Sequence, residues 1–166
     1  VRCDVSDEAA VVSMLSAVRG MGEGDGEGGI RGIIHAAGVI RDSLIRGGGA
    51  SAGCAAVWSS KAHSAWLLHE HTAEDELKYF VVFSSTTSAA GNIGQAAYGY
   101  ANSFLESLVG YRVSRDLCGA SVRWPAVSGG GMAVAAGIDL TGNSIPPADV
   151  ERVLRSIFLR EVEESA

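Results

Sequence analysis

The sequence has little lysine, few basic residues and no long apolar run. Only Lys61 and Lys78 occur among 166 residues, and the 13 Lys and Arg side chains form no block. The formal net charge is −6 and the isoelectric point is near 5.1. We therefore expect neither nucleic acid nor an anionic membrane surface as a partner. No apolar stretch approaches the roughly 20 residues that a membrane-spanning helix needs.

Cysteine and targeting signals are scarce as well. Cys3, Cys54 and Cys118 are odd in number and share no metal-ligand spacing, which indicates reduced thiols. The N-terminus lacks the basic segment and apolar stretch of a signal peptide. A cytoplasmic location is the expectation. The chain does not begin with Met and opens on a predicted strand, so we interpret it as a segment of a longer polypeptide.

What the sequence does contain is the pattern of a folded α/β domain. Hydrophobic residues make up 47% of the chain and charged residues 19%. Apolar strands alternate with helical periodicity, which predicts a Rossmann-like, doubly wound parallel sheet. The strands are expected at residues 1–5, 30–35, 79–84 and 120–124, and the helices at 7–19, 55–72, 95–115 and 147–160, with Ser6 capping the first helix.

The predicted sheet is incomplete at its N-terminus. A dinucleotide's pyrophosphate binds a glycine-rich turn after the first strand of such sheets, and no such turn follows residues 1–5. The first βαβ unit is therefore expected to be missing. Residues 24–29 match the string G-x-G-x-x-G, but they follow a helix and precede a strand, and acidic residues interrupt them. We interpret them as a surface loop.

The most informative stretch joins the strand at 79–84 to the following helix. Ser85 follows a strand that ends at the sheet edge where ligands bind, and Tyr98 and Asn102 share one helix face. Taken singly, Ser85 could cap a turn, Tyr98 could be a core tyrosine and Lys61 could extend from a half-buried helix. Together they indicate a site where a ketone oxygen meets a hydroxyl, a phenol and an amide.

These residues and several motifs resemble the ketoreductase domains of modular polyketide synthases and fatty-acid synthases, a branch of the short-chain dehydrogenase/reductase superfamily. The separations agree, with 24 positions from Lys61 to Ser85, 13 to Tyr98 and 4 to Asn102. Asn102 stands where most of the superfamily has lysine, and Lys61 lies on the earlier helix, as in synthase ketoreductases. The matching motifs are Cys3-Asp4-Val5, His35-Ala36-Ala37-Gly38-Val39, Leu67-Leu68-His69-Glu70, Phe83-Ser84-Ser85, Gly94-Gln95-Ala96-Ala97-Tyr98, Ala101-Asn102-Ser103-Phe104-Leu105, Trp124-Pro125 and Gly129-Gly130-Gly131-Met132.

The resemblance implies a role for each catalytic candidate. Tyr98 would protonate the ketone oxygen while hydride arrives from a nicotinamide, and Ser85 would hydrogen-bond that oxygen. Lys61 would lower the pKa of the Tyr98 phenol and hold the nicotinamide ribose. Asn102 would take part in a proton relay. The cofactor would be NADPH, and the residues implied to bind it are Asp4, Val5, His35, Ala36, Ala37, Gly38 and Lys61.

The resemblance also implies substrate, partners and domain division. The substrate would be a 3-ketoacyl thioester on the phosphopantetheine arm of an acyl carrier protein, with neighbouring synthase domains as partners. Residues 1–135 would form the catalytic subdomain, and residues 136–166 a C-terminal lid and helix that lead to a linker. This chain, without its pyrophosphate-binding half, is not expected to catalyse alone.

Asp42 marks the expected stereochemistry. Ketoreductases of the B type have an Asp just beyond the His-Ala-Ala-Gly turn, and this chain keeps one in Ile40-Arg41-Asp42. The other type has Trp eight positions before the tyrosine, where this chain has Ala90. The resemblance thus implies a D-configured 3-hydroxyl, while a plain turn residue is the alternative for Asp42.

Two rival functions stay open. One is a non-catalytic or truncated ketoreductase remnant with a structural role in a megasynthase, which predicts no cofactor binding. The other is a stand-alone short-chain dehydrogenase, which the absence of lysine after Tyr98 disfavours. No metal is expected, because His69 and His71 point apart on a helix. Trp58, Trp66 and Trp124 are predicted to be core residues.

Overall fold

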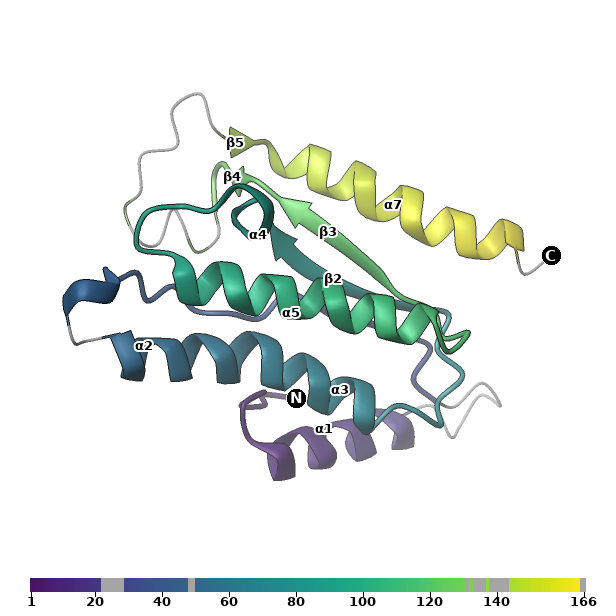
Figure 1. Cartoon of the computed structure of the whole chain (residues 1–166). Coiled ribbons are helices and arrows are strands. Elements are labelled where there is room, and N and C mark those ends of the chain that lie inside the picture. Colours follow the sequence, from purple (N-terminus) through teal and green to yellow (C-terminus); the bar gives the residue numbers. More distant parts are fainter. Residues whose placement is uncertain (22–28, 48–49, 131, 133–136, 138–143, 165–166) are drawn as a thin grey trace.

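The computed structural model describes residues 1–21, 29–47, 50–130, 132, 137 and 144–164. Its centre is a parallel sheet in the order β1 (Gly32–His35), β2 (Tyr79–Ser85) and β3 (Ala120–Trp124) (Figure 1). Every pairing in this sheet is parallel, and β2 lies in the middle. The α/β class is therefore confirmed. Residues 24–28 of the glycine-rich string lie outside the described residues.

The helices surround this sheet. One helical rod consists of α2 (Ala50–Val57), a π-helical turn (Trp58–His63) and α3 (Ser64–Glu70), so it begins five residues earlier than predicted. The remaining elements are α1 (Glu8–Gly20), a 3₁₀ turn (Ile45–Gly47), α4 (Thr87–Ala90), α5 (Ala96–Val113), α7 (Pro147–Glu164) and the short parallel pair β4 (Ala126–Val127) and β5 (Ser144–Ile145). The sequence did not predict α4, β4 or β5.

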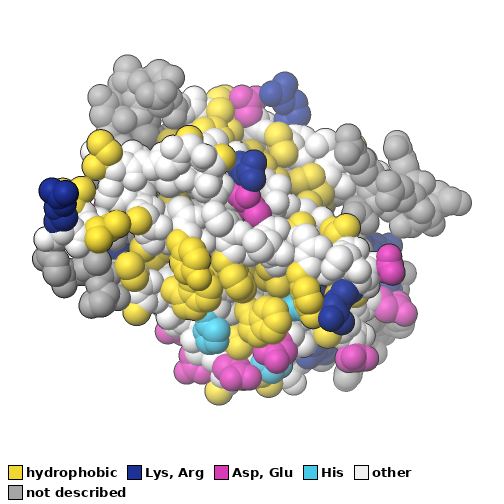
Figure 2. Space-filling model, viewed as in Figure 1, with side chains coloured by type: hydrophobic (Ala, Val, Ile, Leu, Met, Phe, Trp, Pro, Cys, Tyr) yellow, Lys and Arg dark blue, Asp and Glu magenta, His cyan; other side chains and the backbone are white. Residues whose placement is uncertain are grey.

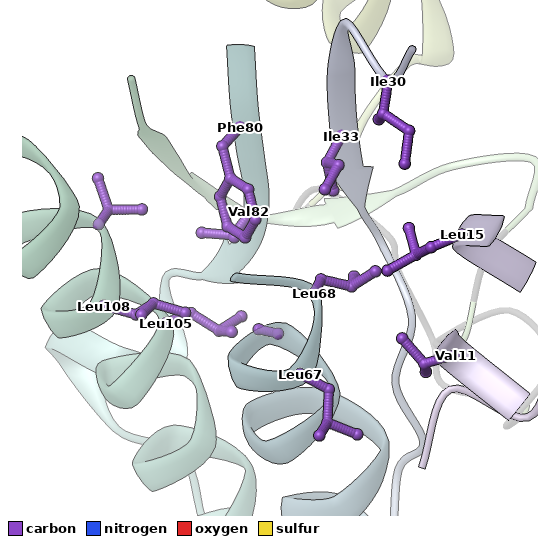
Figure 3. Packing of buried hydrophobic residues seen from close by; sticks show 12 residues of the cluster. Val11, Leu15, Ile30, Ile33, Leu67, Leu68, Phe80, Val82, Leu105 and Leu108 are labelled. Carbon is purple, nitrogen blue, oxygen red and sulfur yellow. The ribbon is translucent and has the colours of Figure 1, made fainter. Parts of the chain in front are cut away.

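The two faces of β2 meet different helices because side chains alternate along a strand. Phe80 and Val82 are fully buried. They belong to one hydrophobic cluster with Leu105 of α5 and with Leu67 and Leu68 of α3 (Figure 3). On the other face, the Tyr79 ring lies 4.7 Å from the Phe158 ring of α7, centroid to centroid. Helices thus cover both faces, as the doubly wound prediction requires.

The N-terminal residues differ from the prediction. Residues 1–5 are not a strand, and Val1 is exposed. A strand needs a neighbour to complete its backbone hydrogen bonds, and in the described part of the chain none pairs with this segment. Asp7, rather than Ser6, caps α1, because its carboxylate accepts a hydrogen bond from the Ala10 amide at 3.1 Å.

The three tryptophans have different environments. Trp124 is buried, whereas Trp58 is half-buried and stacks on Tyr100 at 5.3 Å between ring centroids. Trp66 is exposed, so its assignment to the core was wrong. Hydrophobic side chains gather on the face that α2, α3 and α5 present (Figure 2), where Trp66 packs near Tyr111. Within the described residues, no helix is both long and apolar enough to cross a bilayer.

Candidate active site

A cavity of about 500 Å³ opens where the three parallel strands end. Its lining comes from the last residues of β2 and β3, from the segments that follow β1, β2 and β3, from Lys61 of the π turn, from the Tyr98 end of α5 and from Val150 of α7. The carboxyl ends of parallel strands are the usual place for ligands in open α/β sheets. Four residues that the sequence predicted to be functional line it, namely Ala36, Lys61, Ser85 and Tyr98.

Tyr98 and Asn102 lie one turn apart on α5. Asn102 is fully buried, and its amide nitrogen donates to the Tyr98 carbonyl at 2.8 Å. Its other amide atom, Oδ1, is buried and makes no hydrogen bond with the described residues. Because a buried acceptor without a partner costs free energy, Oδ1 is poised for a donor from water, lysine or ligand.

Lys61 reaches the same cavity from the π-helical turn of the neighbouring rod. Its side chain is 2% exposed, and Nζ donates to the Phe83 carbonyl at 2.7 Å. Nζ also lies 5.5 Å from the centroid of the Tyr98 ring. Burial lowers the pKa of Lys61 to about 8, because desolvation disfavours the ammonium. The π turn adds one residue to the helical repeat and is often found at functional sites.

The pKa of Tyr98 is raised, not lowered as we expected from the nearby Lys61 ammonium. Burial of the phenol is the largest cause, since desolvation disfavours the phenolate. The side chains of Asn102 and Ser85 act in the opposite direction, and the charge of Asp42 adds to the rise. Desolvation therefore outweighs the neighbours, and the phenol is held in its protonated form, from which it can donate.

His35 has a structural contact with the lysine. Its Nε2 lies 2.9 Å from the Lys61 carbonyl and 3.2 Å from the Ser64 hydroxyl. A carbonyl only accepts, so Nε2 carries the proton of the neutral ring. Burial lowers the pKa of His35 to about 4. The strand that ends at His35 thus fixes the turn that presents Lys61.

Small residues follow His35 beside the lysine. Ala36 lines the cavity, and a Cβ added to Gly38 would lie 3.5 Å from Lys61 Cδ. The backbone at Gly38 therefore packs closely against the Lys61 side chain. Ala37, between them, is half-buried.

Ser85 is joined to Asp42 by a chain of hydrogen bonds. The Ser85 hydroxyl donates to Thr87 Oγ1 at 3.2 Å, and Thr87 donates to Gln95 Oε1 at 3.2 Å. Gln95 Nε2 then donates to the exposed Asp42 carboxylate at 2.9 Å. The sequence predicted Asp42 and Ser85 separately and missed Thr87 and Gln95. The position of Gln95 three residues before Tyr98, nearly one helical turn, was the available signal.

Asp4 and Val5 are not among the described residues that line the cavity. Asp4 is exposed, and its carboxylate accepts from the Ser6 hydroxyl at 2.7 Å and from the Ser6 amide at 3.0 Å. The Ser6 hydroxyl and amide lower the pKa of Asp4. Within the described residues, no group of three His, Cys, Asp or Glu side chains is arranged to hold a metal ion.

The fold and this residue set define the class of protein. A tyrosine, a serine and a lysine line the cavity at the carboxyl edge of a parallel α/β sheet, and a buried asparagine lies one helical turn from the tyrosine. The profile of the KR domain matches residues 1–129. The chain therefore belongs to the KR, or ketoreductase, domain family of polyketide synthases.

Individual relatives agree with this assignment. The chain is 36% identical over 148 residues to "Spectinabilin polyketide synthase system protein NorB" of Streptomyces orinoci, covering 87% of this chain and 6% of that protein. It is also 36% identical over 156 residues to "Polyketide synthase GfsA" of Streptomyces halstedii, covering 94% of this chain and 2% of that protein. The chain thus spans a small part of the length of these relatives.

Solved structures show the same fold. "PlmKR1-Ketoreductase from the first module of phoslactomycin biosynthesis in Streptomyces sp. HK803" superposes with a TM-score of 0.71 at 36% identity, covering 80% of this chain and 29% of that one. "Structure of A-type Ketoreductases from Modular Polyketide Synthase" superposes with a TM-score of 0.81 at 27% identity, covering 97% and 34%. The second structure is named as an A-type ketoreductase, and the fold match by itself assigns no stereochemical type to this chain.

Proposed function

We propose that this chain carries the reactive half of a ketoreductase active site, which reduces a 3-ketoacyl thioester to the 3-hydroxyacyl product in polyketide biosynthesis. The observation that supports it most is the convergence of Lys61, Ser85 and Tyr98 on one cavity, with buried Asn102 behind them. Membership of the KR family supports the same reaction class.

The described residues account for proton transfer and for stabilisation of charge. Tyr98, kept protonated by burial, donates its proton to the ketone oxygen as carbon is reduced. The Ser85 hydroxyl turns from Thr87 toward that oxygen and hydrogen-bonds the charge that develops there. The Lys61 ammonium, over the Tyr98 ring, stabilises the tyrosinate that remains. Asn102 Oδ1 accepts from the group that returns the proton.

The residues beside Lys61 fit a nicotinamide cofactor. The cavity of about 500 Å³ that Ala36 and Lys61 line and the unsatisfied acceptor Asn102 Oδ1 are compatible with a nicotinamide ring and its ribose beside the lysine. Such a cofactor would supply the hydride. We propose NADPH, as the family resemblance implies, with Ala37 and the backbone near His35 along its path and with Asp4 and Val5 at its adenine end.

The substrate and partners follow from the same proposal. The 3-ketoacyl group would arrive on the phosphopantetheine arm of an acyl carrier protein, and neighbouring synthase domains would flank this one. The two Streptomyces relatives are polyketide synthase proteins of which this chain covers 6% and 2%, which supports a multidomain setting.

Asp42 supports the B-type outcome, a D-configured hydroxyl. Its carboxylate accepts from Gln95, which also contacts Thr87, the hydrogen-bond partner of Ser85. Ile40 of the same loop lines the cavity, so the loop of Asp42 borders one side of the proposed substrate site. A bordering loop of fixed position can decide which face of the ketone meets the hydride.

The test is Tyr98→Phe in the complete ketoreductase domain, assayed with NADPH and an N-acetylcysteamine 3-ketoacyl thioester. We expect turnover to fall by about two to four orders of magnitude with cofactor affinity largely kept, because only the proton donor is removed. Tyr100→Phe is the matched control, since Tyr100 is exposed on the same helix. Chiral analysis of the wild-type product should show the D-hydroxyl.

Undiminished turnover in Tyr98→Phe would remove Tyr98 as the acid. A complete domain that neither binds NADPH nor turns over would favour the non-catalytic remnant. An L-hydroxyl product would refute the assignment of Asp42 alone and leave the reaction intact.

A further inference from the structure

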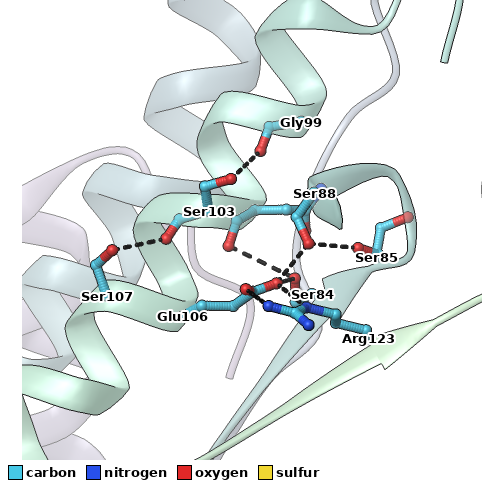
Figure 4. A network of polar contacts seen from close by, with 9 residues as sticks. Ser84, Ser85, Ser88, Gly99, Ser103, Glu106, Ser107 and Arg123 are labelled. Carbon is cyan, nitrogen blue, oxygen red and sulfur yellow. Dashed lines mark hydrogen bonds and ion pairs between the residues drawn. The ribbon is translucent and has the colours of Figure 1, made fainter. Parts of the chain in front are cut away.

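Glu106 is an acidic side chain outside the cavity that ties three elements together. It lies on α5, and its Oε1 accepts from the hydroxyls of Ser84 at 2.6 Å and Ser88 at 2.5 Å. Arg123 of β3 donates from Nε to Oε1 at 2.9 Å and from Nη2 to Oε2 (Figure 4). We name these four residues, Ser84, Ser88, Glu106 and Arg123, the Glu106 clamp.

The clamp holds the chain on both sides of Ser85. Ser84 immediately precedes Ser85 on β2 and is buried. Ser88 follows in α4, and its hydroxyl also lies 2.8 Å from the Ser85 carbonyl. Both hydroxyls that donate to Glu106 therefore belong to residues on either side of Ser85 in the chain.

Glu106 shares a helix face with the tyrosine and the asparagine. Tyr98, Asn102 and Glu106 are spaced by four residues along α5, so their side chains stand above one another. Ser84 Oγ also lies 3.5 Å from the Asn102 carbonyl. The carboxylate thus connects the helix that carries the phenol with the turn that carries the serine.

We propose that Glu106 is a positioning residue, which fixes the Ser85 hydroxyl relative to the Tyr98 phenol. This inference rests on the proposed function, because the distance between these two groups matters for a shared ketone oxygen. A displacement of about 1 Å in such a site can cost a hundredfold in rate.

The charge of Glu106 suits this role. Hydrogen bonds from Arg123 hold the pKa of Glu106 at about 2, with the hydroxyls of Ser84 and Ser88 acting in the same direction. The carboxylate is therefore ionised at neutral pH. It accepts from every donor around it and never has to donate.

The experiment compares Glu106→Gln with Asp75→Asn in the complete ketoreductase domain. The Gln amide has one acceptor oxygen in place of two, so it cannot accept from both serines and from both Arg123 nitrogens, and its NH₂ group must face one of these sets of donors. Asp75 is the matched control, because its carboxylate also accepts two hydrogen bonds from one arginine. Arg19 donates to it from Nε at 3.0 Å and from Nη2 at 2.6 Å. The Asp75 side chain is 13% exposed against 18% for Glu106, and Asp75 precedes β2 at the end opposite Ser85.

We expect kcat to fall about tenfold to a hundredfold in Glu106→Gln, while KM and the Kd for NADPH change less than about threefold. Asp75→Asn should lower Tm by about as much as Glu106→Gln does, and it should leave kcat within about twofold of the wild-type value. Glu106→Asp keeps the charge but shortens the side chain by one methylene, so it should recover only part of the lost kcat. Equal kcat in Glu106→Gln and Asp75→Asn would overturn the positioning role.

A second measurement does not need turnover. The Ser85 side chain lowers the pKa of Tyr98, so releasing Ser85 should raise that pKa further. Ring-labelled tyrosine NMR can follow this titration, with Tyr98→Phe identifying the signal. An unchanged Tyr98 pKa in Glu106→Gln would refute the proposal that Glu106 positions Ser85. A wild-type domain without turnover would instead refute the proposed function and leave this readout valid.

Discussion

Lys61 combines a burial that lowers the stability of the fold with a proposed role in the active site. Its ammonium is buried at 2% exposure, and it donates a hydrogen bond to the Phe83 carbonyl. No carboxylate forms an ion pair with it among the described residues. Burying a charge without a counter-ion destabilises a protein, as the lowered pKa reflects. Such residues are typical of functional sites.

We therefore predict that Lys61→Met keeps or raises Tm at pH 7 while NADPH-dependent turnover falls by about two orders of magnitude or more. Methionine fills a similar volume without the charge. Differential scanning fluorimetry and steady-state kinetics on the complete domain measure both effects. A Tm that falls by many degrees would show instead that the ammonium stabilises the fold.

At the scale of elements, the loop between α4 and α5 connects the helix of Tyr98 to the loop of Asp42. The Ser43 amide donates to the Gly94 carbonyl at 2.9 Å, and Gln95 donates to Asp42. Gly94 has a φ of +78°, a conformation that residues with a Cβ rarely adopt. Its neighbours lie at ordinary contact distance, so the backbone angle is what requires glycine there.

The matching test substitutes alanine at two glycines. Gly94→Ala should lower the free energy of unfolding by about 1 kcal/mol because of its positive φ. Gly110→Ala should raise it by about 0.5–1 kcal/mol, since this glycine is inside α5 with open space around it. Urea denaturation measures the free energy of unfolding of both variants. A Gly94→Ala domain as stable as the wild type would show that the positive φ at this position does not require glycine.

Most elements could be predicted from local pattern, because apolar residues repeat with the period of a buried strand or an amphipathic helix. The strand β3 and the body of α5 lie where the pattern placed them. Residues 1–5 have the composition of a strand, but strand formation also needs a partner, which local sequence does not reveal. The π turn around Lys61 leaves no periodic signal, because it shifts the repeat by one residue.

At the scale of the whole molecule, buried histidines join the layers. His35 links the sheet to the Lys61 turn, and burial lowers its pKa to about 4. His69 of α3 lies 2.9 Å from the Arg112 guanidinium of α5, and its pKa is lowered by burial and by that charge. Its Nδ1 must accept from the guanidinium, so protonation would remove this contact.

The lowered pKa values of His35 and His69 make the stability of the domain depend on pH. A histidine with a lowered pKa binds its proton more readily in the unfolded chain, so acid favours unfolding. Stability should be complete above about pH 6.5 and should decline as the pH falls toward 4. Urea denaturation at pH 7.5 and 5 would show this loss, and His35→Gln should reduce it. A wild-type domain equally stable at both values would contradict the role of His35.

Local sequence was sufficient for the fold class, because the period of apolar residues is a property of the chain itself. The family resemblance implied the set Lys61, Ser85, Tyr98 and Asn102, and the structure places the first three on one cavity. Tertiary structure decided the rest. Burial raised the pKa of Tyr98 against expectation, and the Glu106 clamp joined residues of β2, α4, α5 and β3. Desolvation and contacts across elements depend on how distant segments pack, and no local pattern encodes them.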